Sequence, residues 1–169
     1  MYVRATVRNQ AKIVNCTFLE DESQENEEYA TAIAVYNPNP AQEGSLSLRN
    51  SIIWGAWWEG KPFITGEGGP VMLDIANCDI ATGLKGVWAA SVSWPAPMGT
   101  DWGEDYPLFN FNDGGWAYYY RLMPESPVIN KGADKWVISG ETDMEGHPRI
   151  VGAAVDMGAY EVQDPLHTR

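Results

Sequence analysis

The sequence feature that most constrains the fold is a short pattern that occurs three times. In each copy Asn precedes a Cys or Ser, and apolar residues follow: VNCTFLE at 14–20, RNSIIWG at 49–55 and ANCDIAT at 76–82. A constant core with loops of unequal length between its copies is typical of stacked repeats. Because Asn tolerates the left-handed backbone region, we predict that Asn15, Asn50 and Asn77 each turn a sharp corner between two strands.

If the three corners stack, the side-chain amides lie about 4.8 Å apart, at the spacing of paired strands, and can form a ladder of hydrogen bonds. The residues that follow each Asn then form a second column, of Cys16, Ser51 and Cys78. Two positions further on, an apolar inner column contains Phe18, Ile53 and Ile80. Two cysteines that lie two repeats apart are too distant for a disulfide, which needs Cα atoms within about 7 Å. We therefore predict two free, buried thiols.

The remaining pattern favours short strands. The segments ATAIAVY at 30–36, LSLRN at 46–50 and VMLDIA at 71–76 are β-prone and are bounded by Gly, Pro or Asn. Two of them alternate apolar and polar residues, as strands with one buried face do, and helical periodicity is scarcely visible. We predict an all-β chain with stacked repeats over 1–82, an irregular C-terminal cap over 83–161 packed on them, and a tail at 162–169.

Charge and hydropathy exclude two classes of partner. The chain has 23 acidic and 11 basic residues, a formal net charge of −12. Such a surface repels phosphate backbones, so we expect no nucleic-acid partner. No run of 18 apolar residues is present, so the sequence predicts no membrane span.

Two loops hold candidate ligand-binding residues. The first, LEDESQENEE at 19–28, is rich in Glu and reads as a solvated loop, with a calcium site as the alternative, since Ca²⁺ collects carboxylates from irregular loops. The second carries adjacent Trp57 and Trp58, which cannot easily both point inward. One exposed indole would be a platform for a sugar ring, whereas packing against the flank of the repeats is the alternative.

The C-terminal third resembles a known family. DYPLFN, YRLMPESPVINKGAD and DMEGHPRIVGAAVDMGAYE are similar to the closing segment of right-handed parallel β-helix proteins of the pectate-lyase-like superfamily, and NCTF and NSIIWG are similar to their repeat core. The pattern departs from the family at Tyr106, Asn130 and Lys131. The resemblance implies a short solenoid of about three coils, and a chain that forms the C-terminal part of a longer protein that is secreted or on the cell surface.

Within the matching segment, three charged residues admit two interpretations. Arg149, Asp156 and Glu161 could be catalytic, but a buried Arg held by carboxylates would pin the last segment to the preceding loop, and we favour this structural role. His147 and His167 lie too far apart in the chain to indicate a metal cluster or a triad. No metal site is predicted from them.

For function, the sequence favours a non-enzymatic module that is structural or binds a glycan or a surface protein. The alternative that the resemblance implies is a polysaccharide lyase or glycoside hydrolase. Lyases need a basic residue as base, and hydrolases need two carboxylates about 5–10 Å apart. The repeats offer only Lys12, Arg49, Asp74 and Asp79, with no aligned pair visible. Unpaired strand edges at an open N-terminal end also predict self-association.

Overall fold

The computed structural model describes residues 3–5, 10–19, 33–54, 64–81, 87–88, 92–93, 102–103, 106–110 and 120–163. The acidic loop proposed as a calcium site lies outside these residues, apart from Leu19. Trp57 and Trp58, the predicted sugar platform, also lie outside them. The binding predictions at both loops therefore stay predictions.

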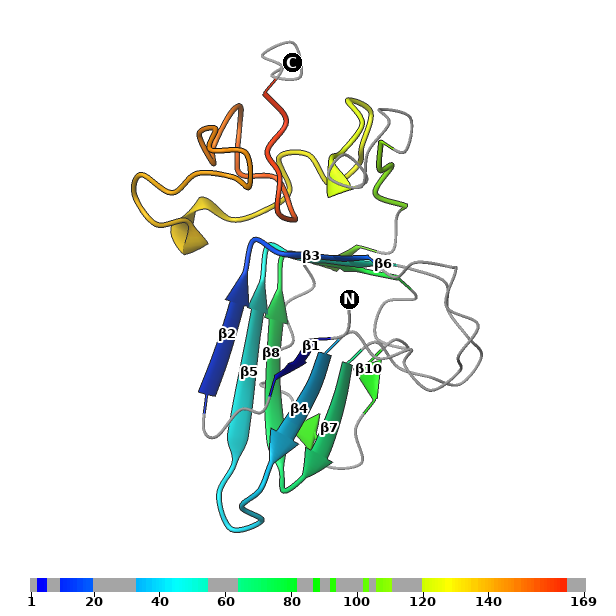
Figure 1. Ribbon diagram of the computed structural model, residues 1–169, viewed down its shortest axis with the longest axis vertical. Helices are drawn as coiled ribbons and strands as arrows, with labels where there is room; N and C mark the ends of the chain where they lie inside the picture. The colour runs from blue at the N-terminus through cyan, green and yellow to red at the C-terminus, as the bar shows by residue number, and fades with distance from the viewer. Residues whose placement is uncertain are drawn as a thin grey trace.

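The described strands form three parallel, four-stranded sheets (Figure 1). The first contains β1 (Val3–Ala5), β4 (Ile33–Asn37), β7 (Ile64–Gly68) and β10 (Val87–Trp88). The second contains β2 (Gln10–Val14), β5 (Gly44–Arg49), β8 (Val71–Ala76) and β11 (Val92–Ser93). The third contains β3 (Thr17–Leu19), β6 (Ile52–Trp54), β9 (Cys78–Ile80) and β12 (Trp102–Gly103). The chain visits the sheets in turn, so each strand pairs with the strand three places along.

The all-β prediction is confirmed, but the assignment to the pectate-lyase-like right-handed β-helix family is wrong. The described residues form small, separate parallel sheets, and they do not show the closed or solenoid sheet that the family resemblance implied. The physical reason is that the Asn motif specifies a local corner, which does not fix the extent or continuity of the sheets around it. Three strands, β10 to β12, lie within 83–161, the range expected to be irregular, and each has only two residues.

The three asparagines occupy equivalent corners between the second and third sheets. Their φ angles are 54° at Asn15, 47° at Asn50 and 52° at Asn77, all in the left-handed region. The residue before each corner is in register with its counterparts, Val14 with Arg49 and Arg49 with Ala76. Asn50 Nδ2 donates a hydrogen bond of 3.1 Å to Asn15 Oδ1, and Asn15 N–H donates to the Arg49 carbonyl at 3.1 Å.

The main core fills the space between the sheets. Strand alternation places Leu46 and Leu48 inward, while Ser45 and Ser47 on the same strand stay half-buried. Phe18, Ile53 and Ile80 lie in register on the third sheet and pack into this core. Cys16 and Cys78 are free, and Cys16 is only partly buried. Cys16 N–H donates to Ser51 Oγ at 3.2 Å, as expected where the two residues share a column.

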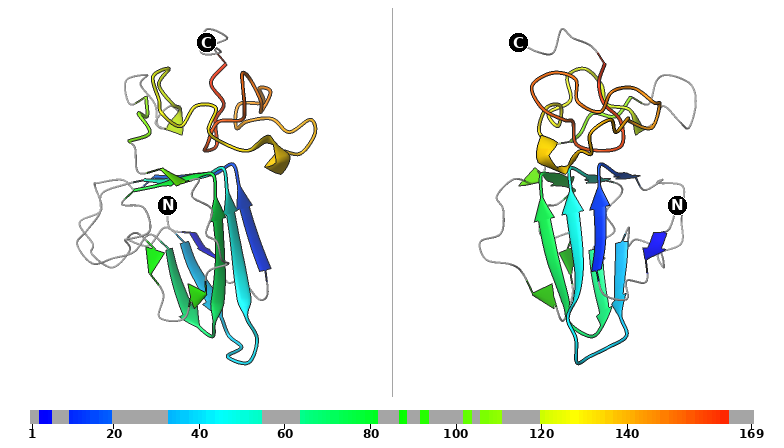
Figure 2. Two further views of the ribbon diagram at one scale, coloured as in Figure 1. Left: turned by 180° about the vertical axis from the view of Figure 1, so that it is seen from behind. Right: turned by 90° about the vertical axis from the view of Figure 1, so that its left-hand side faces the viewer.

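Residues 121–163 are irregular apart from isolated bridges and one 3-10 turn, η4 (Asp134–Trp136). They lie against the outer face of the third sheet rather than across an end of the strand stack (Figures 1 and 2). A second apolar cluster joins the two parts, in which Ile52 of β6 packs with residues beyond the strands: Phe109, Leu122, Val128 and Met157. Among the described residues, no helix is long and apolar enough to cross a membrane.

Candidate functional site

The outer face of the second sheet carries a row of polar residues. Lys12 on β2, Ser47 on β5 and Asp74 on β8 are direct register partners. Because side chains alternate along a strand, the neighbouring Leu46 and Leu73 point into the core and this row points outward. The row therefore places cationic, hydroxyl and carboxylate groups side by side at strand spacing.

Arg49, at the end of β5, is the buried member of this face. Its side chain is 5% exposed and forms an ion pair with the Asp74 carboxylate. Its guanidinium also donates to the carbonyl oxygens of Leu48, at 2.9 Å, and Asp74. A guanidinium held by a carboxylate and two carbonyls is fixed in orientation, so Arg49 offers a rigid, planar cation to whatever covers it.

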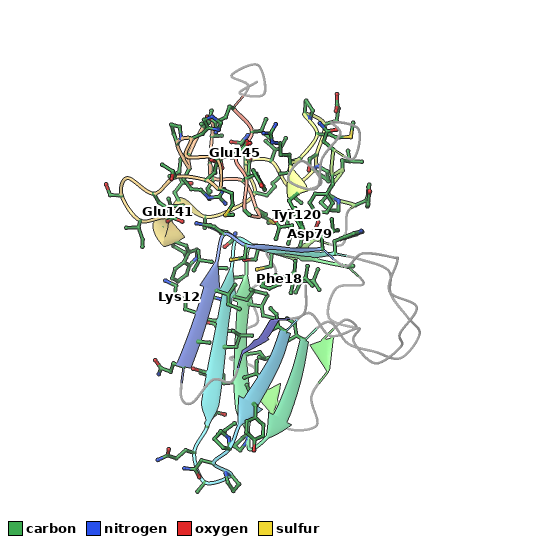
Figure 3. All side chains as sticks on the ribbon, in the orientation of Figure 1. Lys12, Phe18, Asp79, Tyr120, Glu141 and Glu145 are labelled. Carbon is green, nitrogen blue, oxygen red and sulfur yellow. The ribbon has the colours of Figure 1, made fainter. Side chains whose placement is uncertain are left out.

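The indole of Trp136, at the end of η4, covers this cation. The ring centroid lies 4.8 Å from Arg49 Cζ, 5.0 Å from Lys12 Nζ and 5.2 Å from Lys135 Nζ. Figure 3 shows Lys12 on the outer side of β2, below η4. Cation–π contacts contribute about 0.5–1 kcal/mol each at exposed sites and about 2 kcal/mol when desolvated. Three cations thus converge on one half-buried aromatic ring.

The two lysines differ from the arginine in their electrostatic surroundings. Lys12 and Lys135 are exposed, and neither forms an ion pair with any residue that the structure describes. Arg49 is paired with Asp74, so Lys12 and Lys135 are the cations beside Trp136 that have no carboxylate partner among the described residues. This cationic spot stands on a protein whose formal net charge is −12.

The asparagine corner positions the indole. Asn50 Oδ1 accepts a hydrogen bond of 2.8 Å from Ala133 N–H, and Asn50 Nδ2 donates to the Ala133 carbonyl at 3.2 Å. That carbonyl also accepts the backbone N–H of Trp136 at 3.1 Å, within the η4 turn. Asp134 Oδ1 accepts Val155 N–H at 2.8 Å and ties the turn to the final segment. The same amide that contacts Asn15 therefore anchors η4 over the second sheet.

The predicted cap residues Arg149, Asp156 and Glu161 do lie together, at 2%, 1% and 4% exposure. Arg149 donates to the carbonyls of Asp156 and Gly158, and its Nη1 lies 4.0 Å from Glu161 Oε2. Both carboxylates accept backbone N–H groups, two for each residue: those of Val151 and Asp156 at Glu161, and those of Asn130 and Val162 at Asp156. These bonds link successive turns of the final segment and hold its backbone in place, as expected for a structural role.

Burial also perturbs the protonation of this cluster. Desolvation raises the pKa of Glu161 to about 7, against the opposing effect of its hydrogen bonds and of Arg149. Desolvation lowers the pKa of Arg149, which the surrounding carboxylates oppose. The two thiols show the same physical effect: burial raises the pKa of Cys16, and it raises that of Cys78 to about 12. Thiols of this kind are poor nucleophiles, since the thiolate is the reactive form.

The structure brings together three of the four charged residues noted on the repeats, Lys12, Arg49 and Asp74. The fourth, Asp79, is buried on β9 of the third sheet, on the side that faces Tyr120 and the C-terminal segment (Figure 3). Trp136 was not predicted from the sequence, in which its only local signal is an aromatic residue flanked by Lys135 in a segment without strand pattern. Its contact with β2 and β5 is visible only in three dimensions.

In comparisons with known proteins, the chain matches no protein-family model, no curated protein and no solved structure.

Proposed function

We propose that this chain is a non-enzymatic binding module, displayed outside the cell, that takes an anionic glycan on the face around Trp136. The observation that carries the proposal is the convergence of Lys12, Arg49 and Lys135 on one indole. An aromatic face stacks on the apolar face of a sugar ring, and an ammonium group pairs with a sugar carboxylate or sulfate. The half-buried Ser45 and Ser47 add hydroxyl groups to the same sheet face.

The ion pair between Asp74 and Arg49 supports binding of a glycan, rather than its hydrolysis, at this face. A hydrolase needs two carboxylates that can exchange protons with the substrate, and the Asp74 carboxylate is held by Arg49. A lyase also needs a base placed beside the proton that it removes, and the two lysines at this face lie against the Trp136 ring. We therefore favour binding over the polysaccharide-active alternative.

The proposal is tested by isothermal titration of the whole chain with polygalacturonate and with dextran, as an anionic and a neutral polysaccharide. We expect binding of polygalacturonate only. Trp136→Ala should weaken it roughly tenfold or more, about 1.4 kcal/mol. The double variant Lys12→Ala, Lys135→Ala should abolish it.

The matched control is Lys131→Ala, which removes an exposed lysine of the same segment that is not among the described cations over the Trp136 ring. This variant should bind like the parent protein, and thermal unfolding should show that each variant is folded. The proposal would be contradicted if the control and the double variant lost affinity equally. It would also be contradicted if the parent chain bound neither polysaccharide. Release of unsaturated products, followed by ultraviolet absorbance, would revive the lyase alternative.

A further inference from the structure

A tight loop near the C-terminus is held in shape by one buried carboxylate. Thr142 and Pro148 form an antiparallel bridge, and Asp143 N–H donates to the His147 carbonyl at 2.9 Å. Asp143 Oδ1 accepts the backbone N–H groups of Glu145 and His147, both at 2.9 Å. The Asp143 side chain is 1% exposed, so this oxygen fixes the backbone of the two residues that flank Gly146.

The second oxygen of each carboxylate in the loop faces the imidazole. Asp143 Oδ2 lies 3.8 Å from His147 Nδ1, and Glu145 Oε2 lies 4.0 Å from the same nitrogen. The other oxygen of Glu145 pairs with Arg121, which sets the direction of that carboxylate. Asp143 Oδ2 accepts only a long bond of 3.3 Å, from Glu161 N–H. One buried oxygen and two partly exposed groups thus converge on a common point.

We propose that Asp143, Glu145 and His147 bind a divalent transition-metal ion of the Zn²⁺ class. The three ligand atoms lie within 4.8 Å of one another. With metal–ligand bonds of about 2.0–2.2 Å, they can surround one ion after small rotations of the two exposed side chains. One imidazole nitrogen with two carboxylate oxygens suits Zn²⁺ and its neighbours, whereas Ca²⁺ and Mg²⁺ prefer all-oxygen sets.

Two features of the loop prepare these ligands for an ion. Asp143 orients the backbone of both other ligands, and the Arg121 pair holds Glu145, so the ligand set needs little ordering on binding. His147 is half exposed, which leaves the remaining coordination positions to water. The sequence predicted no metal here because its two histidines, His147 and His167, lie far apart in the chain.

The test is titration of the chelator-treated chain with ZnCl₂ by calorimetry, with Co²⁺ absorption spectra to report the ligand field. We expect one ion per chain. His147→Ala should weaken its binding at least a hundredfold, and Glu145→Gln should weaken it about tenfold. His167→Ala removes the other histidine, at the tail, and should leave binding unchanged.

Zn²⁺ should raise the unfolding temperature of the parent chain but not of His147→Ala, since a ligand that binds only the folded state stabilises it. Binding that survives in His147→Ala would assign the ions to other carboxylates, such as the acidic loop, and would overturn the proposal. So would an absence of binding by the parent chain.

Discussion

At the scale of single residues, the asparagine corners connect local backbone conformation to the candidate site. Asn50 is fully buried, has a φ of 47°, and bonds to both Asn15 and Ala133. A left-handed backbone costs other L-residues about 1–2 kcal/mol, and Asn lowers that cost. One side chain therefore stabilises the corner, the contact between successive repeats and the attachment of η4.

Replacement of Asn50 separates the backbone strain at the corner from the loss of its side-chain hydrogen bonds. We expect Asn50→Ala to reduce the free energy of unfolding by about 3 kcal/mol, from the strained backbone and the lost buried hydrogen bonds. Asn50→Gly keeps the backbone freedom and should cost less, so the difference measures the strain. Chemical denaturation gives both values. Asn39→Ala, which removes an exposed turn bond to Ala41, is the control, and an equal loss there would contradict the assigned role.

Glu161 gives the protein a pH dependence of known sign. Burial raises its pKa in the folded state to about 7, above its ordinary value of 4.5, so the folded state holds the proton more tightly than the unfolded state. The contribution of Glu161 to stability is therefore greatest below pH 4.5 and falls as pH rises from 4.5 to 7. At about 1.36 kcal/mol per pKa unit, the full change is on the order of 3 kcal/mol.

Glu161→Gln isolates this contribution from those of Arg149 and Asp156, whose charges also act on the Glu161 carboxylate. The plot of unfolding free energy against pH, between 4.5 and 7, should fall less steeply in the variant than in the parent chain. Denaturation at a series of pH values measures both slopes. Identical slopes would show that Glu161 is ionised throughout this range.

At the scale of elements, the fit between the C-terminal segment and the third sheet depends on small residues. Gly158 N–H donates to the Asn50 carbonyl at 2.8 Å, and Ala159 N–H donates to Thr17 Oγ1 at 2.9 Å. A Cβ atom at Gly158 would lie 2.6 Å from Thr17 Oγ1 and 2.9 Å from Ile52 Cδ1. The glycine permits the close approach of a strand and an irregular segment.

Gly158→Ala should therefore loosen this contact. The residue has a φ of 100°, so alanine suffers backbone strain in addition to the clash with β3 and β6, and we expect a loss of about 2–4 kcal/mol. Gly140→Ala is a matched control, because Gly140 has a φ of 82° and open space around its Cβ position, and should lose about 1 kcal/mol. Thermal unfolding compares the two variants, and equal losses would mean that packing at Gly158 contributes nothing.

At the scale of the whole molecule, the net charge and the edge strands of the sheets govern self-association of the chain. In each sheet the first strand of the chain is an edge strand, and the last strand lies at the opposite edge. The first strands are β1, β2 and β3, and the last are β10, β11 and β12. Ala11, Ile13 and Phe18 pack against the core there and are only partly buried. Edge strands beside an apolar end favour pairing with another chain, whereas the net charge of −12 opposes it.

We therefore expect self-association that increases with salt. Raising ionic strength shortens the screening length to about 3 Å at 1 M and removes the repulsion between acidic copies, while it leaves apolar contacts intact. Static light scattering should show a mass that grows with protein and salt concentration. A monomer mass throughout the series would exclude association through this end.

Residue patterns in the sequence predicted much of the local structure. The corners at Asn15, Asn50 and Asn77, the free cysteines and the buried group of Arg149, Asp156 and Glu161 all follow from short motifs whose geometry is set by neighbouring residues. The two-residue strands of the last repeat could not be predicted, because alternation needs more residues to be visible. The continuous solenoid was wrongly inferred, since similarity at corners and in a terminal motif does not specify how sheets extend.

The sequence by itself determined the all-β character, the repeated corners and the acidic charge, because each depends on composition or on residues close together in the chain. Only the tertiary structure decided which side chains meet: Trp136 over Lys12 and Arg49, and the C-terminal segment on the side of the third sheet. These contacts join residues far apart in sequence. Their geometry depends on how irregular backbone satisfies its hydrogen bonds on a preformed sheet, which no local pattern encodes.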